Sequence, residues 1–311
     1  MEFGLVLPTM AAGASREGIE AAAETASRLG WGSVWVSDHV LVPHAAAAEF
    51  GTVFEALTTL AFVGGRYADL RLGTSVLVAP QRDAIMLAKE LATLDALTGG
   101  RLIVAVGVGN DPDEYLNLGY ADRFAVRGAY LDEAICLWRC LWSGSESPFH
   151  GRFHDLTDFT FGPLPANKER IPVLIGGKSE RAFERAGLLG DGYHSGQIGP
   201  SEFGRRAQLV QAVASKAGRP KPQLSARVGV RFGPPPASGR YRLAGDPAQM
   251  VGDVNAFAAA GCQQLVVAFG ENDPDRVVAA VQRFHEDVVE PTRQQFAAGE
   301  SAVPVILGES R

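Results

Sequence analysis

The sequence predicts a (β/α)8 TIM barrel, a single domain in which eight parallel strands alternate with helices. Short apolar segments and helical patterns follow one another along most of the 311 residues. The run 102–106 is almost continuously apolar, which is typical of a strand covered on both faces. No linker-like stretch divides the chain, so a doubly wound sheet with a second domain is the weaker alternative.

One complete strand–helix–strand unit is visible in 70–109. Residues 70–78 are rich in β-branched side chains, which favours a strand. Leucines then recur at i, i+4 and i+7 within 84–97, so one helical face is apolar. Two glycines after residue 98 end this helix, because glycine adopts the left-handed C-cap without a clash. The unit predicts a parallel sheet, and ligands of such folds bind at the carboxyl ends of the strands.

The other elements follow from the same two periodicities. Short apolar runs predict strands at 2–7, 33–37, 71–76, 102–106, 172–175, 191–195, 225–230 and 264–268. Apolar stripes predict helices at 15–29, 53–65, 84–97, 122–142, 179–188, 201–217, 247–260 and 274–290. The stripe of the longest helix consists of Leu131, Ile135, Trp138 and Trp142. Each predicted strand is followed by a predicted helix, as a (β/α)8 barrel requires.

Two segments interrupt the alternation. The first, 143–165, is polar, aromatic and glycine-bearing, and it predicts a short hairpin or lid; a surface excursion without a role is the alternative. The second, 231–243, contains three consecutive prolines, which predict a stiff, non-helical course. We expect one barrel domain at 1–290, an insertion and lid region at about 107–171, and a C-terminal tail at 291–311.

Composition favours a cytoplasmic enzyme with a large core. Hydrophobic residues make up 46% of the chain and charged residues 21%, and the net charge of −6 argues against a nucleic-acid partner. No apolar run approaches the ~18 residues of a membrane span. The first predicted strand begins at the N-terminus, so we expect no signal peptide.

The cysteines fit a reducing compartment. They number three, an odd count without the spacing of a disulfide framework. Cys136 and Cys140 lie one helical turn apart, but no nearby His or Cys pair completes a tetrahedral metal site. We expect both to be buried thiols and no metal to be bound.

Three familiar motifs are incomplete. The segment 177–179 resembles the end of a phosphate-binding P-loop, but Pro172 stands where its first glycine belongs. The Gly-x-Gly at 107–109 begins a dinucleotide fingerprint, but Pro112 replaces its last glycine. The Ser-Asp-His at 37–39 is contiguous, whereas a hydrolase triad brings together residues that are distant in sequence. These departures disfavour an ATPase, an NAD-dependent Rossmann enzyme and a serine hydrolase.

Asp38 and His39 are candidate site residues because they end the second predicted strand. A carboxylate there can accept hydrogen bonds from a cofactor or orient polar neighbours. The imidazole titrates near neutral pH and can move a proton. The alternative is that Asp38 only caps the following turn.

Glycine-rich strand ends form the other candidate sites. The run Gly176-Gly177-Lys178-Ser179 joins the fifth strand to a helix, whose first N–H groups can bind a phosphate. A tight turn without a ligand is the alternative. Small residues at 73–75 and 107–110 end the third and fourth strands and leave room for a flat ring.

Taken together, these blocks resemble the bacterial-luciferase-like flavin and deazaflavin oxidoreductases. The resemblance covers about 1–290 and is carried by GWGSVWVSDH, LGTSVLVAPQRDAIMLAKELATLDALTGGRLIVAVGVG, RGAYLDEAICLWRCLW, IPVLIGGKSERAFERAGLLGDGYHSG and GDPAQMVGDVNAFAAAGCQQLVVAF. It implies a usually dimeric (β/α)8 barrel with an insertion after the fourth strand and FMN or coenzyme F420 at its carboxyl face. It also implies a non-prolyl cis peptide at Ser75–Val76, in a bulge of the third strand that backs the cofactor ring.

The deazaflavin branch of that family has an Asp-His pair similar to Asp38-His39. The resemblance implies that Asp38 contacts the ring and that His39 lies at the reacting face. It also implies that Val108, Gly109 and Asn110 flank the ring, and that the run 176–179 holds the phosphate. The sugar-phosphate dehydrogenases of this branch have a glutamate acid where this chain has Asn110, and asparagine cannot deliver a proton at neutral pH. We therefore do not expect a sugar-phosphate substrate.

The resulting expectation is a homodimeric, coenzyme F420-dependent oxidoreductase. It would transfer a hydride between the deazaflavin C5 and a small organic substrate, with His39 as the proton donor or acceptor. An FMN-dependent monooxygenase and a non-catalytic protein that binds the coenzyme are the alternatives.

Overall fold

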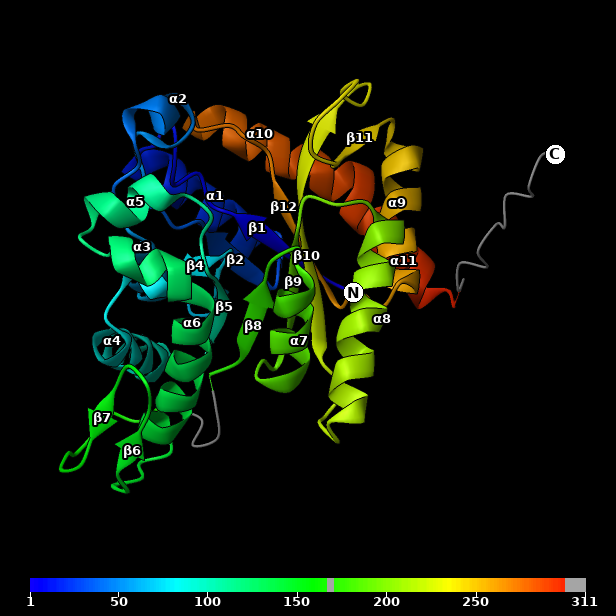
Figure 1. The fold of residues 1–311 in the computed structure, drawn as a ribbon. Coiled ribbons are helices and arrows are strands. Elements are labelled where there is room, and N and C mark those ends of the chain that lie inside the picture. Colours follow the sequence, from blue (N-terminus) through cyan, green and yellow to red (C-terminus); the bar gives the residue numbers. More distant parts are fainter. Residues whose placement is uncertain (167–170, 300–311) are drawn as a thin grey trace.

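The computed structural model describes residues 1–166 and 171–299, and its central feature is a closed barrel of eight parallel strands (Figure 1). The barrel strands are β1 (Glu2–Val6), β2 (Ser33–Val36), β3 (Arg71–Thr74), β5 (Leu102–Gly107), β8 (Val173–Gly176), β9 (Gly192–Gly196), β10 (Gln223–Phe232) and β12 (Gln264–Ala268). Each strand pairs with the next in this order, and β12 closes the ring against β1. The short strand β4 (Leu77–Val78) continues β3 after a bulge and also pairs with β5. The predicted fold class is confirmed.

Helices surround the barrel and connect its strands. The main ones are α1 (Arg16–Arg28), α3 (Ala56–Gly64), α4 (Ala84–Leu97), α6 (Ala121–Trp142), α7 (Glu180–Leu188), α8 (Pro200–Lys216), α9 (Pro247–Ala259) and α10 (Pro274–Phe284). Short segments add η1 (His44–Ala46), α2 (Ala47–Phe50), η2 (Ala79–Gln81), α5 (Pro112–Asn117), the π-helical turn η3 (His285–Val289) and α11 (Glu290–Ala297). Several helices begin at a side chain that accepts from a free backbone N–H, as Ser15 does for α1 and Asp83 for α4.

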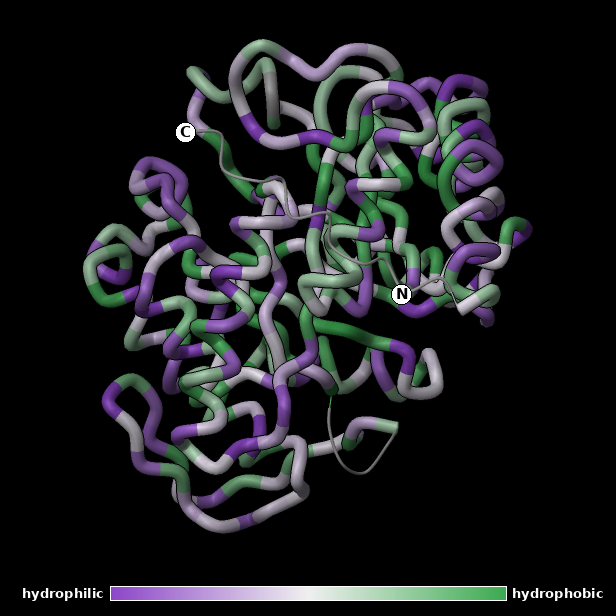
Figure 2. The backbone as a smooth tube through the Cα atoms, turned by 90° about the vertical axis from the view of Figure 1, so that its right-hand side faces the viewer, coloured by the Kyte–Doolittle hydropathy of each residue, from purple (hydrophilic) through white to green (hydrophobic). Residues whose placement is uncertain are grey.

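The core has two layers. Trp35 fills the inside of the barrel and packs with Ile103, Ala105, Leu174 and Val266. A Cβ atom at Gly73 would lie 2.2 Å from the Trp35 ring, so the neighbouring strand must carry glycine there. The larger layer lies between the strands and the helices. Figure 2 shows hydrophobic stretches gathered along the central strands, with hydrophilic segments mostly on the periphery.

The insertion after β5 contains α5, α6 and a hairpin of β6 (Phe149–His150) and β7 (Asp155–Leu156), which confirms the predicted hairpin. The carboxylate of Glu133 on α6 accepts from the backbone N–H groups of Phe153 and His154 at 2.9 and 2.8 Å. This contact holds the hairpin against α6. In Figure 1 the hairpin lies at the opposite end of the molecule from α2, α5 and β11 (Arg242–Gly245). A lid over the barrel mouth would require 143–165 to leave this position.

The non-helical course expected for 231–243 is confirmed, because β10 continues to Phe232 and β11 pairs with it in parallel. One expectation about buried side chains needs correction. Cys136 is exposed and Cys140 is half-buried, so the expectation of buried thiols was wrong for this pair. The apolar stripe of α6 turns toward α4, where the Trp138 Nε1–H donates to the Ala84 carbonyl oxygen at 2.9 Å, and Cys136 lies on another face of the helix.

The ends of the described chain and its surface add three facts. Residues 290–297, at the start of the expected C-terminal tail, form α11, and 300–311 lie outside the described residues. Across 1–166 and 171–299, no three His, Cys, Asp or Glu side chains are grouped to hold a metal ion. Within the same ranges, no helix has both the length and the apolar character that crossing a bilayer requires.

Candidate active site at the barrel mouth

The expected site residues follow the carboxyl ends of neighbouring strands, so barrel closure brings them to one face. Asp38 and His39 follow β2, Val108–Asn110 follow β5, and Gly177–Ser179 follow β8. Ser75 and Val76 lie in the bulge between β3 and β4, and their peptide bond is cis, as the resemblance implied. The structure therefore assembles on one face residues that are separated by up to 141 positions in the sequence (Asp38 to Ser179).

Val76 explains why two strand ends carry glycine. A Cβ atom at Gly107 would lie 2.8 Å from Val76 Cγ2, and one at Gly176 would lie 2.7 Å from Val76 Cγ1. The Val76 side chain therefore inserts between the ends of β5 and β8. These two glycines make room for the bulge, a role that the sequence alone did not reveal.

Asp38 is buried, and its carboxylate is held entirely by protein groups. The Val78 N–H donates to Oδ2 at 2.8 Å, and Arg82 donates from both terminal nitrogens at 2.9 and 3.0 Å. Burial raises the pKa of the Asp38 carboxyl, while the Arg82 guanidinium acts in the opposite direction. Arg82 also pairs with Glu55 at 3.0 Å. These contacts tie the end of β2 to the segment that follows the Ser75–Val76 bulge.

His39 is half-buried and is joined to a carboxylate that sequence reasoning missed. Its Nδ1 lies 3.3 Å from Glu114 Oε2, and its ring packs against the Phe50 ring with a centroid separation of 4.3 Å and a tilt of 30°. Glu114 comes from α5 and is buried, and its other oxygen accepts from the Val40 N–H at 2.9 Å. Burial raises the pKa of Glu114, but the hydrogen bonds from His39 and Val40 outweigh it, so the pKa is lowered. No local spacing signals this pair, because 75 residues separate its members.

Residues after β5 line the same face. Val108 is half-buried, and its carbonyl oxygen accepts from the buried Tyr115 hydroxyl at 2.7 Å. Gly109 has a φ of 66°, which favours glycine. Asn110 is exposed.

The glycine-rich run after β8 leads into α7. Ser179 caps this helix by accepting from the Ala182 N–H at 3.3 Å, and Lys178 and Ser179 are exposed. The Tyr193 hydroxyl donates to the Gly177 carbonyl oxygen at 2.8 Å. This geometry leaves the start of α7 open to an anion.

A buried series of hydrogen-bonded side chains lies beneath the bulge, and sequence reasoning did not predict it. The Ser75 hydroxyl lies 2.8 Å from His194 Nε2, and His194 Nδ1 lies 2.7 Å from the Ser225 hydroxyl. The imidazole stacks on Trp35 with a centroid separation of 5.0 Å. Burial, with a smaller effect of Arg227, lowers the pKa of His194 to about 3, so the ring is neutral at pH 7.

Arg227 of β10 completes the group around the bulge. Its Nη1 donates to the Ser75 carbonyl oxygen at 2.8 Å and to the Ser37 hydroxyl at 2.9 Å. Among the described residues, Arg227 Nε is one of the buried polar atoms that have no hydrogen-bond partner. Because buried polar groups usually have partners, this atom suits a bound polar ring such as that of a flavin or deazaflavin.

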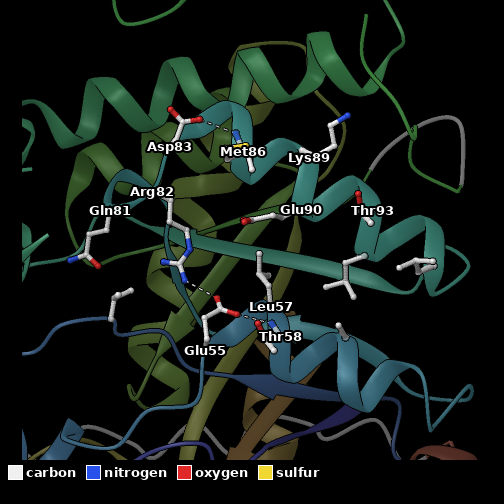
Figure 3. A pocket seen from close by; sticks show the side chains of 14 residues that line it. Glu55, Leu57, Thr58, Gln81, Arg82, Asp83, Met86, Lys89, Glu90 and Thr93 are labelled. Atoms are coloured by element: carbon white, nitrogen blue, oxygen red, sulfur yellow. Dashed lines mark hydrogen bonds and ion pairs between the residues drawn. The ribbon is translucent and has the colours of Figure 1, made fainter. Parts of the chain in front are cut away.

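A separate groove of about 700 Å³ lies outside the barrel, between α3 and α4. Figure 3 shows Arg82 and Glu55 paired at one end of it, with Met86, Lys89, Glu90 and Thr93 arranged along α4. Met86 is 58% exposed and Leu97, at the other end, is 80% exposed. Arg82 connects this groove to the strand-end site, because it also pairs with Asp38.

The comparison with protein-family models decides the family. A model described as luciferase-like monooxygenase matches residues 1–240. The chain belongs to the luciferase-like monooxygenase family. An uncharacterized protein from Mycobacterium tuberculosis is 30% identical over 213 residues, which cover 64% of this chain and 72% of that protein. An F420-dependent glucose-6-phosphate dehydrogenase from Amycolatopsis mediterranei is 34% identical over 170 residues, which cover 54% of this chain and 50% of that enzyme.

Solved structures share the luciferase-like fold over nearly the whole chain. An F420-dependent secondary alcohol dehydrogenase in complex with an F420-acetone adduct has a TM-score of 0.78 at 18% identity, covering 93% of this chain and 98% of that chain. The FMN complex of the oxygenating constituent of 3,6-diketocamphane monooxygenase from Pseudomonas putida has a TM-score of 0.76 at 14% identity, covering 93% and 98%. At these identities the likeness shows the fold alone. The chain spans about half the length of the curated F420-dependent dehydrogenases that it matches.

Proposed function

We propose that this chain is a coenzyme F420-dependent oxidoreductase that transfers a hydride between the deazaflavin C5 and a small organic substrate. The observation that carries the proposal is His39, a half-buried imidazole at the barrel mouth that is held by the buried carboxylate of Glu114. Curated relatives named as F420-dependent dehydrogenases support the choice of coenzyme. The bound deazaflavin would supply the hydride chemistry, and the protein would supply position and electrostatics.

In this proposal His39 moves the substrate's proton. Glu114 holds Nδ1, so Nε2 is the nitrogen left to exchange a proton with the substrate. Asn110, close in sequence to α5, lies at the open side and contacts the substrate or the ring. Neither role requires a sugar phosphate, and the substrate is proposed only as a small organic molecule.

The remaining site residues would bind the cofactor. Ser75 and Val76 would back the ring, while Val108 and Gly109 would flank it. Asp38 would act indirectly. Its carboxylate accepts hydrogen bonds from Arg82 and from the Val78 N–H, and these contacts position the segment that follows the bulge. The run Gly176-Gly177-Lys178-Ser179 would hold the phosphate at the start of α7.

An FMN-dependent monooxygenase is the second candidate, because a structural neighbour with the same barrel is an FMN complex. The two functions differ in the ligand that binds and in its reactivity. A reduced flavin reacts with oxygen, whereas a deazaflavin does not. Cofactor choice therefore separates the two proposals before any substrate is known.

The test is a titration of the purified protein with coenzyme F420 and with FMN, followed by fluorescence. We expect F420 to bind more tightly than FMN by at least about tenfold, or roughly 1.4 kcal/mol. His39→Asn should keep this affinity, with the exposed His150→Asn variant as the matched control. Tighter binding of FMN, together with oxygen consumption by the reduced complex, would favour the monooxygenase. Binding of neither cofactor would contradict both.

A further inference from the structure

Arg227 projects into the barrel rather than onto its outer surface. Its neighbours Ala226 and Val228 belong to the core between the strands and the helices. Since successive side chains of a strand point to opposite faces, Arg227 points inward. Its contacts agree, because Nη1 reaches both the Ser37 hydroxyl and the Ser75 carbonyl oxygen across the barrel.

The charge of Arg227 lacks a counter-ion among the residues that the structure describes. Its hydrogen-bond partners are a hydroxyl and a carbonyl oxygen, and its buried Nε has no partner. Arg82 lies at the same mouth and differs sharply, because it pairs with both Asp38 and Glu55. Burial, reinforced by Arg240, lowers the pKa of Arg227 to about 10. The group is still protonated at pH 7, so a positive charge stands unneutralised inside the mouth.

Arg227 is half-buried, and a cation withdrawn from water without a counter-ion is costly unless a ligand neutralises it. The guanidinium is planar and presents parallel N–H donors, which match a planar anion whose charge is shared between two atoms. Nη1 is already engaged by protein oxygens, which fix the orientation of the plane. Nε and Nη2, on the other edge of the same plane, are the parallel donors left for a ligand.

We propose that Arg227 is the anion-binding residue of the barrel mouth, and that it receives a planar, delocalised anion through its Nε edge. The two sources named for this anion rest on the proposed function. One source is the pyrimidine part of the reduced deazaflavin, whose charge is shared between a ring nitrogen and a carbonyl oxygen. The other source is a carboxylate of the substrate.

The first test compares Arg227→Met, which removes the charge at similar length, with Arg231→Met on the exposed end of the same strand. Dissociation constants for oxidised and reduced F420 are measured by absorbance and fluorescence titration. If the anion is the reduced cofactor, Arg227→Met weakens the reduced form at least about tenfold more than the oxidised form. The midpoint potential of the bound cofactor then falls by about 30 mV for each tenfold difference. Arg231→Met should change neither quantity.

The second test uses acetate as a monocarboxylate probe. If the anion is a substrate carboxylate, the oxidised and reduced forms of F420 each bind Arg227→Met as tightly as they bind the wild type. Acetate then perturbs the cofactor spectrum of the wild-type complex but not that of the variant. Acetate should also raise the melting temperature of the cofactor-free wild-type protein and leave Arg227→Met unchanged. This last measurement needs no F420, so it tests Arg227 even if the proposed cofactor is wrong.

Stability separates a ligand-binding arginine from a structural one. Removing a half-buried, unneutralised charge should leave the melting temperature of Arg227→Met equal to that of the wild type or above it. A marked loss of stability would show that Arg227 serves the fold. If Arg227→Met does not fold, Arg227→Lys keeps the charge and loses the planar fork, so it should fold and bind the anion at least about fivefold more weakly. Wild-type affinities of a folded Arg227→Met variant for both redox forms and for acetate would overturn the proposal.

Discussion

His194 should make the stability of this protein fall steeply in mild acid. Its ring is buried between the Ser75 and Ser225 hydroxyls and stacks on Trp35. Its pKa is lowered from 6.5 to about 3 by burial. Between these two pH values, the His194 ring is therefore protonated in the unfolded chain and neutral in the folded chain. The neutral ring contributes its full stability above pH 6.5 and loses it as the pH falls toward 3.

The size of the effect follows from proton linkage. Between pH 7 and pH 5, a group with an unfolded pKa of about 6.5 that stays neutral in the folded state lowers the free energy of unfolding by about 2 kcal/mol. Any folded-state pKa below about 4 gives nearly the same value, because the folded ring hardly binds a proton over this range.

The assay is urea unfolding at pH 7 and at pH 5, for the wild type and for His194→Gln. The variant keeps a polar side chain without a titrating ring, so the other acids cancel in the difference between the two proteins. The wild type should lose about 2 kcal/mol more than the variant over this range. His150→Gln is the control, since His150 has an exposed side chain. An equal loss in wild type and His194→Gln would refute the argument that His194 is held neutral.

Three further predictions concern the cofactor, the chemistry and the assembly. Lys178→Met should weaken F420 binding about tenfold, or roughly 1.4 kcal/mol, without changing the melting temperature, because Lys178 is exposed at the start of α7; unchanged affinity by titration would contradict a phosphate site there. His39→Ala should lower turnover by roughly 10²–10⁴ while F420 still binds, whereas near wild-type turnover would leave His39 a structural role. The protein should sediment as a dimer of twice its 33.0 kDa mass, and Leu97→Glu, on the exposed apolar end of α4, should shift it toward the monomer. A monomeric wild type at micromolar concentration would contradict this expectation.

Local pattern was enough to predict the architecture. The strand at 102–106 was recognisable from its unbroken apolar run, and it forms β5 at Leu102–Gly107. The helix at 84–97 was bounded by its own sequence, because Asp83 caps its start and glycines follow its end. Such signals depend on residues within about one turn of each other, and a single sequence contains them in full. The alternation of these elements then leaves few topologies.

The inner arrangement of the mouth depended on contacts between residues that are far apart in the chain. Gly73 and Gly176 were interpreted as space for a ligand, yet Trp35 and Val76 occupy the space beside them. A glycine in the sequence indicates that another group approaches the backbone closely, but it does not indicate whether that group is a ligand or a side chain of the protein.

The hydrogen-bond partners of the site residues could not be predicted from the sequence either. His39 meets Glu114 across 75 residues, and the cation of Arg227 reaches Ser75 across 152. The sequence by itself therefore determined the barrel, its strand ends and the candidate residues Asp38 and His39. Only the tertiary structure decided which groups neutralise, orient or crowd one another there, because barrel closure brings together side chains whose separation along the chain carries no periodic signal.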